Sequence, residues 1–135
     1  MDKVRFGYFS DFSDPTLLFF GSEKALNGMK DLLMSLQEGD VIQLDKDSHF
    51  QPIRDTRVML SLAKMEQEGS ITFIEAGKPC LQWHPSKMDI ADIIEKLDVV
   101  IGSTTPCHHY LDSFSMDDEV VVQVSKGEFP DDFGQ

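Results

Sequence analysis

Two stretches of the chain repeat apolar residues at spacings of three and four, which is the period of an amphipathic helix. The first stretch follows Ser22, a good N-cap residue, and Gly39 can end it. The second follows Ser86, which Asp89 can answer in a short capping box, and Gly102 marks its end at the latest. The apolar stripes consist of Ala25, Leu26, Met29, Leu32, Leu33 and Leu36 in the first helix and of Ile90, Ile93, Ile94 and Leu97 in the second.

Shorter apolar stretches have the features of β-strands, either alternation of polar and apolar residues or a run of β-branched residues. Residues 120–124 contain four valines and are apolar on both faces, so we expect them at a central position in a sheet. Residues 71–75 and 80–83 flank the sequence Ala-Gly-Lys-Pro, which predicts a hairpin. The other predicted strands cover residues 4–8, 16–20, 40–44 and 57–62.

The order of these elements is neither a regular alternation of strands and helices nor an all-β pattern. It predicts an α+β fold with a largely antiparallel sheet of about six or seven strands and two helices packed on one face. A chain of 135 residues fits a single domain that spans residues 1–135. The apolar fraction of 41% makes its core plausible without a metal or disulfides, and we predict no cofactor.

Charge limits the classes of partner. The chain has 12 Lys and Arg against 24 Asp and Glu, a net charge of -12, which repels nucleic acid and anionic lipid and favours a basic protein partner. The alternative is that the acidic residues only keep the protein soluble. No apolar run approaches the ~20 residues that cross a bilayer, and the first five residues lack the pattern of a secretory signal, which predicts a cytoplasmic protein. Two cysteines predict reduced thiols in a reducing compartment.

One polar cluster has residue types that occur in catalytic and metal sites. It consists of Cys107, His108 and His109, followed by Asp112. Neighbouring side chains in an extended segment usually point apart, and the paired short spacing of zinc ligands is missing, so we predict no metal site and no enzyme. A small hydrolase or metal-dependent enzyme that uses Cys107, His108 and His109 remains the alternative function. Trp83 is predicted to fill the core, with its indole N–H bonded to a backbone carbonyl.

Acidic and aromatic residues gather towards the C-terminus, a mixture typical of protein interfaces, where aromatic anchors have a polar rim. Solvated surface charges are the alternative interpretation. The acidic residues are Asp112, Asp117, Asp118, Glu119, Glu128, Asp131 and Asp132, and the aromatic ones beside them are Tyr110, Phe114 and Phe129.

Two short motifs carry a resemblance to a known family. Residues 108–112 read His-His-Tyr-Leu-Asp, and residues 124–130 read Val-Ser-Lys-Gly-Glu-Phe-Pro. This ending resembles the carboxy-terminal signature of bacterial polymorphic-toxin immunity proteins, in which H-x-Y-L-D is followed by V-S-x-x-E-[YF]-P. The strand at 17–21, the following helix and strand, and Trp83 before the second helix agree in outline. His109 stands where glutamine is more often expected, which leaves the role of that position open.

The resemblance implies a cytoplasmic, non-enzymatic inhibitor of a contact-dependent or Rhs-type toxin that binds the toxin's catalytic domain. It carries over no binding residue. Together with the charge, it predicts an immunity protein that blocks the active site of a cationic nuclease domain. Assembly with copies of itself, as a homodimer joined through a sheet edge, is a third possibility. Partner contacts are predicted first at Tyr110, Asp112, Asp117, Asp118 and Glu119, and second at Asp11, Phe12 and Asp14.

Overall fold

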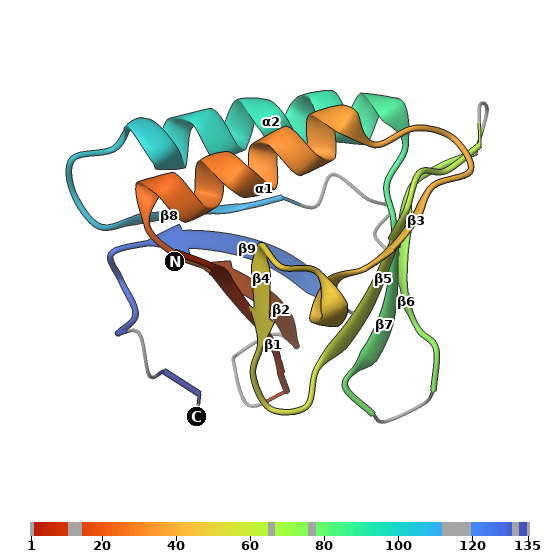
Figure 1. Ribbon diagram of the computed structural model, residues 1–135, viewed down its shortest axis with the longest axis horizontal. Helices are drawn as coiled ribbons and strands as arrows, with labels where there is room; N and C mark the ends of the chain where they lie inside the picture. The colour runs from red at the N-terminus through yellow and green to blue at the C-terminus, as the bar shows by residue number, and fades with distance from the viewer. Residues whose placement is uncertain are drawn as a thin grey trace.

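The computed structural model describes residues 2–10, 15–64, 67–75, 78–111, 120–130 and 133–134. Within them, the strands form two mixed sheets, and two helices pack against each other above both (Figure 1). The five-stranded sheet contains β4 (Phe50–Pro52), β1 (Val4–Phe9), β2 (Thr16–Phe20), β9 (Val121–Lys126) and β8 (Cys107–Tyr110), in this order. The four-stranded sheet contains β3 (Val41–Gln43), β5 (Arg57–Ser61), β7 (Cys80–His84) and β6 (Ser70–Phe73).

The α+β class with two helices is confirmed. The predicted hairpin is present as the antiparallel pair β6–β7, and β9 has β2 on one side and β8 on the other. The prediction was one largely antiparallel sheet of six or seven strands, whereas the described strands number nine and form two mixed sheets. Three of the pairings are parallel and join strands that do not follow each other along the chain. These pairings are β1–β4, β2–β9 and β5–β7.

Both helices begin where the sequence predicts. Helix α1 (Glu23–Ser35) has Ser22 as N-cap, and the Ser22 hydroxyl accepts from the Ala25 N–H at 3.1 Å. Helix α2 (Lys87–Gly102) has the complete capping box, in which the Ser86 hydroxyl accepts from the Asp89 N–H and the Asp89 carboxylate accepts from the Ser86 N–H. Each cap satisfies backbone groups that would otherwise lack a partner in the first turn. A short 3-10 helix, η1 (Leu44–Lys46), follows β3.

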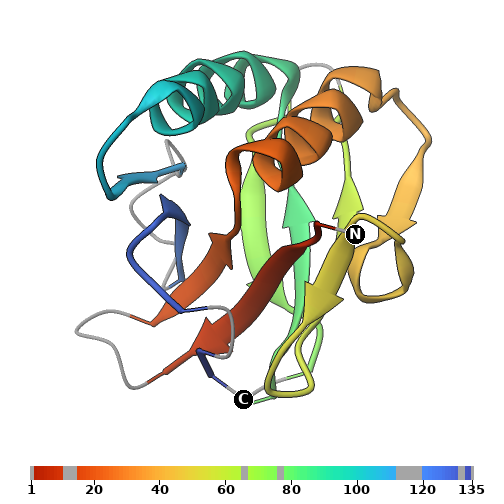
Figure 2. The same cartoon turned by 60° about the vertical axis from the view of Figure 1, so that its left-hand side comes forward.

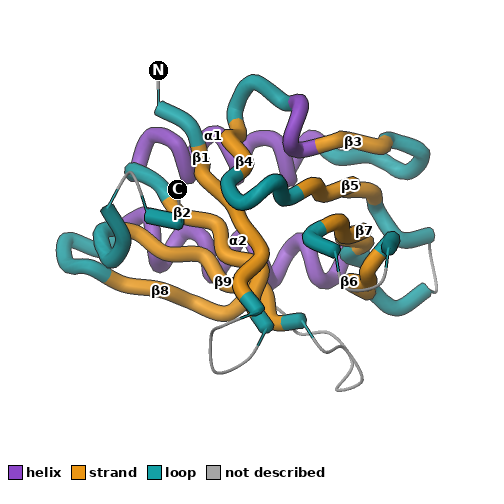
Figure 3. Tube along the Cα trace, turned by 90° about the horizontal axis from the view of Figure 1, so that it is seen from below, coloured by secondary structure: helices purple, strands orange, loops and turns teal. Residues whose placement is uncertain are grey.

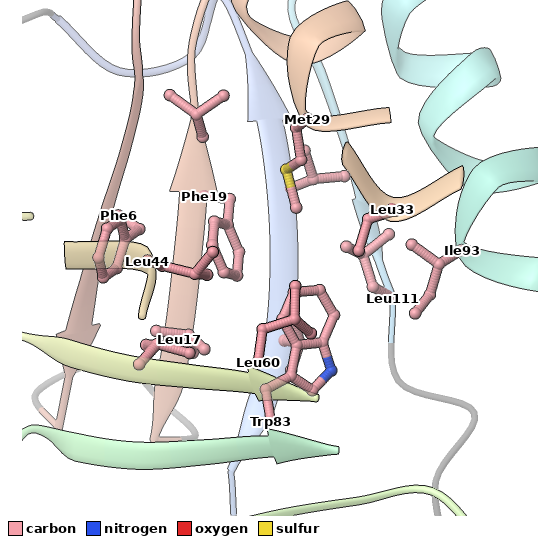
Figure 4. Close-up of a cluster of buried hydrophobic side chains, with 14 of the residues drawn as sticks. Phe6, Leu17, Phe19, Met29, Leu33, Leu44, Leu60, Trp83, Ile93 and Leu111 are labelled. Atoms are coloured by element: carbon pink, nitrogen blue, oxygen red, sulfur yellow. The ribbon is translucent and has the colours of Figure 1, made fainter. Parts of the chain in front are cut away.

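The main core lies between the two sheets and under the helices (Figure 4). Trp83 is fully buried, and its ring lies 5.3 Å from that of Phe19, while Phe6 stacks on Phe19 at 5.8 Å. The core position predicted for Trp83 is confirmed. The hydrogen bond expected for its indole is not found, because the Trp83 Nε1–H has no acceptor in the described part of the chain. Apolar packing therefore holds this side chain in place.

A second, smaller core lies on the other face of the five-stranded sheet. Residues 127–130 and 133–134, which we call the C-terminal strap, run back over β1 and β2, and Figure 2 shows the C-terminal end beside β1. The Phe133 ring stacks on Phe9 at 5.3 Å, and Phe129 packs against Phe20 at 5.7 Å. The buried residues beneath the strap are Phe9, Leu18, Phe20 and Ile53. The five-stranded sheet is therefore covered on both faces, which explains the buried stretch Val122 to Ser125 in β9.

Candidate functional site

Tyr110 is the one predicted contact residue that the structure describes. It ends β8, one of the two edge strands of the five-stranded sheet, and 52% of its surface is exposed. An exposed tyrosine can lose a large area to water when a partner binds, because its ring buries apolar surface while its hydroxyl stays hydrogen-bonded. The other predicted contacts lie outside the described residues; they are Asp11, Phe12, Asp14, Asp112, Asp117, Asp118 and Glu119.

The described residues that flank these predicted contacts lie together. Thr16 is in register with Phe9 on one side and with Val121 on the other. The Val121 N–H donates to the Pro15 carbonyl at 2.9 Å, and the Leu111 N–H donates to the Val122 carbonyl at 2.7 Å. Residues 11–14 and 112–119 are therefore joined to neighbouring strands at the same end of the five-stranded sheet. We call this the acidic end of the molecule, since the two segments contain six acidic residues and no Lys or Arg.

The excess of negative charge is concentrated in the sequence. All 12 Lys and Arg lie among the described residues, together with 15 of the 24 acidic residues. The other nine acidic residues lie outside them, and six of these nine belong to the two segments of the acidic end. Most of the negative charge excess is therefore carried by a few short stretches of sequence, two of which join the five-stranded sheet at the same end as Tyr110.

His108 and Glu128 link Tyr110 to the C-terminal strap. The His108 ring meets the Tyr110 ring edge to face, with 5.8 Å between centroids, and its Nδ1 lies 2.7 Å from Glu128 Oε1. The buried Ser125 hydroxyl donates to the same carboxylate oxygen at 3.0 Å. His108 therefore packs beside Tyr110 and is held by the strap. The bond to Glu128 was not predicted, because 20 positions separate the two residues and no local pattern marks the pair.

Phe129, one of the predicted aromatic anchors, packs within the chain. It is half-buried in the C-terminal strap and packs on Phe20 and Phe133. Its position beside acidic residues in the sequence suggested an interface, but its ring contributes to the second core instead. Phe114 lies outside the described residues.

The alternative catalytic cluster is divided by the strand that carries it. Side chains alternate along β8, so Cys107 and His109 lie on one face and His108 and Tyr110 on the other. Cys107 packs against the main core. A thiol and an imidazole on opposite faces cannot exchange a proton directly, so Cys107 and His108 do not form a nucleophile and base pair. Within the described ranges, no group of three or more His, Cys, Asp or Glu side chains is arranged to hold a metal ion.

One further pair of polar side chains was missed by sequence analysis. Ser61 Oγ lies 2.8 Å from His84 Nδ1, on adjacent strands β5 and β7. These strands run parallel and are separated by β6 in the chain, so nothing local indicates the contact. Among the described residues, Asp2, Ser22, Glu23, Lys24 and Asn27 line a hollow of about 380 Å³ at the start of α1, which is open to solvent.

Comparison with protein-family models, curated proteins and solved structures found no match to this chain. None of the helices in the described ranges is long and apolar enough to cross a membrane.

Proposed function

We propose that this chain is an immunity protein that binds the catalytic domain of a basic protein toxin and blocks its active site. The toxin domain in this proposal is a nuclease. The observation that carries the proposal is the acidic end. Two segments with six acidic residues and no basic residue join the five-stranded sheet at the end where β8 finishes with the exposed Tyr110. The carboxy-terminal resemblance to polymorphic-toxin immunity proteins supports the same function.

The mechanism is occlusion. A nuclease needs a basic groove to hold the phosphates of its substrate, and an acidic protein surface can occupy the same electrostatic field. Charge complementarity raises the association rate more than it raises the final affinity, and a buried aromatic side chain slows dissociation. Tyr110 is the described residue best placed for the second role. His108 is held by its bond to Glu128, and its ring contacts the Tyr110 ring edge to face. This contact gives the tyrosine ring a fixed support.

Co-expression tests the proposal directly. The catalytic domain encoded immediately upstream is expressed in cells with and without this chain, and growth is followed. We expect growth to stop with the domain alone and to recover with the chain, and the two proteins to co-purify. A metabolic enzyme in the upstream position, or unrelieved growth arrest, would contradict the proposal.

A cysteine variant separates inhibition from catalysis by this chain. Cys107→Ser removes the nucleophile of the alternative enzyme, while its side chain lies on the face of β8 opposite Tyr110. We expect Cys107→Ser to protect cells as well as the parent chain does. Cys80→Ser, which removes the other free thiol, is the matched control. Loss of protection with Cys107→Ser but not with Cys80→Ser would point to thiol chemistry instead.

A further inference from the structure

Strand β8 lies at one border of the five-stranded sheet, with β9 on one side and no further strand of the described chain on the other (Figure 3). It pairs with β9 in antiparallel register, and the Leu111 N–H, directly after it, donates to the Val122 carbonyl at 2.7 Å. Residues that are hydrogen-bonded to the neighbouring strand alternate along an antiparallel ladder with residues that are not. The backbone of His109 therefore bonds to β9, whereas the N–H and C=O groups of His108 and Tyr110 point to the free edge.

The backbone groups of His108 and Tyr110 are open to a further strand. Both residues are exposed, and within the described ranges no hydrogen bond is made by their N–H or C=O groups. The other edge strand of this sheet, β4, is less open, because the Phe50 N–H donates to the Asp47 carbonyl at 3.1 Å and Pro52 has no N–H. Unpaired backbone groups at a sheet edge are a template for a strand of another chain, which is a common way for proteins to bind extended segments.

A carboxylate beside this edge has one oxygen that is still open. Glu128 Oε1 accepts from the buried Ser125 hydroxyl at 3.0 Å and lies 2.7 Å from His108 Nδ1, so β8 and β9 together fix the position of the carboxylate. Among the described residues nothing bonds to Glu128 Oε2, and 30% of the side chain is exposed. A strand added to β8 would have a side chain next to His108 on the same face. A lysine or arginine there would meet an acceptor that is already in place, and such charge-assisted bonds are stronger than neutral ones.

The charges around this edge favour a basic segment as its partner. β8 leads directly into residues 112–119, which contain four acidic residues and no Lys or Arg. Edge strands that are protected against pairing often carry lysine, which β8 lacks. A second copy of this chain has a net charge of -12 and would be repelled, whereas an extended basic segment would be attracted by charge and held by backbone hydrogen bonds.

We propose that a β-strand of the toxin domain pairs with the free edge of β8 and extends the five-stranded sheet, with a lysine or arginine of that strand bonded to Glu128. This inference rests on the proposed function and adds how the partner is bound. His108 and Tyr110 each offer one N–H and one C=O to the added strand. Tyr110 would then contact the toxin domain through its backbone as well as through its ring.

Amide hydrogen exchange, followed residue by residue by NMR, tests the strand pairing on the full chain alone and bound to the catalytic domain encoded immediately upstream. We expect the His108 and Tyr110 amides to exchange at least about tenfold more slowly in the complex, because they become hydrogen-bonded. The His109 amide, which bonds to β9, should exchange slowly in both states. The matched control is the Phe73 amide, which faces the free edge of β6 by the same alternation and should exchange equally fast in both.

The outcomes separate this inference from the proposed function. A complex in which the His108 and Tyr110 amides exchange as fast as in the free chain would overturn the strand pairing and leave the proposed function standing. A toxin domain that does not bind would overturn the proposed function, and the strand pairing with it.

A charge-removing variant tests the role of Glu128. Glu128→Gln keeps an oxygen that can accept from the Ser125 hydroxyl but removes the charge, and it should raise the dissociation constant of the complex at least about fivefold. Glu95→Gln makes the same chemical change at an exposed position on α2 and should leave the constant within about twofold of that of the parent chain. Equal dissociation constants for the two variants would overturn the bond between Glu128 and a basic side chain of the added strand.

Discussion

Gly7 lies in the middle of β1, where a larger residue would collide with a buried side chain. A Cβ atom at this position would lie 2.6 Å from Ile53 Cγ1 and 3.1 Å from the Phe9 ring. Ile53 is 3% exposed and packs beneath the C-terminal strap, so it has little room to move. The second core therefore requires a residue without a Cβ atom at this position.

Two glycine substitutions of identical chemistry should have opposite effects. Gly7→Ala overpacks the second core and should lower the free energy of unfolding by about 1–3 kcal/mol. Gly28→Ala lies within α1, where the new Cβ meets only His49 Cδ2 at 3.6 Å, an ordinary contact. It should raise the free energy of unfolding by up to about 1 kcal/mol, since alanine favours the helix. Urea denaturation followed by the fluorescence of Trp83, the single tryptophan, measures the free energy of unfolding of both variants. An unchanged free energy of unfolding for Gly7→Ala would contradict this prediction and mean that Ile53 repacks freely.

For individual residues, sequence analysis succeeded where the interaction joins residues close together in the sequence. The caps at Ser22 and Ser86 were predicted because a cap residue and its target lie three positions apart. Tyr110 was singled out as an aromatic residue beside acidic ones in the sequence, and its exposure agrees with a contact role without testing it. The bond between His108 and Glu128 and the pair Ser61 and His84 could not be predicted, because each depends on which strands become neighbours.

The same limit explains what was missed among the elements. β4 contains three residues and ends in a proline, and β8 consists of Cys-His-His-Tyr, so neither has the apolar alternation of a strand. Both are edge strands, which have a neighbouring strand on one side only. The apolar pattern required of such strands is therefore weaker than that of central strands. The helices and β9, whose apolar patterns are long, were predicted with nearly their observed limits. The mixed character of the two sheets comes from three long-range parallel pairings, which no local pattern encodes.

The C-terminal strap should contribute measurably to stability. Phe129 and Phe133 are half-buried, so replacing both with alanine should lower the free energy of unfolding by on the order of 1–2 kcal/mol for each residue. The uncovered Phe9 and Phe20 should also bind the dye ANS, which reports exposed apolar surface.

The matched control for the strap is the double variant Met34→Ala and Ile74→Ala, which truncates two exposed apolar side chains. It should change the free energy of unfolding by less than about 0.5 kcal/mol and leave dye binding unchanged. If both double variants behaved alike, the strap would not be part of the folded core.

On the scale of the whole molecule, the described core residues and most of the acidic excess lie in different parts of the sequence. The apolar residues form one large core and one small one, and most of the acidic excess lies in short stretches between strands or beyond the last strand. We therefore expect the acidic residues of the acidic end to act on a partner and not on folding, which sets them apart from surface charges that only maintain solubility.

The association rate with the toxin domain tests this separation most directly. Asp117, Asp118 and Glu119 are replaced together by lysine, and a control variant carries Asp31→Lys, Glu38→Lys and Glu95→Lys, exposed positions on or beside the helices. Both variants change the net charge equally. Stopped-flow measurements from low to physiological salt should show a rate that falls steeply with salt for the parent chain and for the control, and a slow rate with little salt dependence for the acidic-end variant. Equal rates and salt dependences for all three proteins would contradict the proposed inhibitor surface.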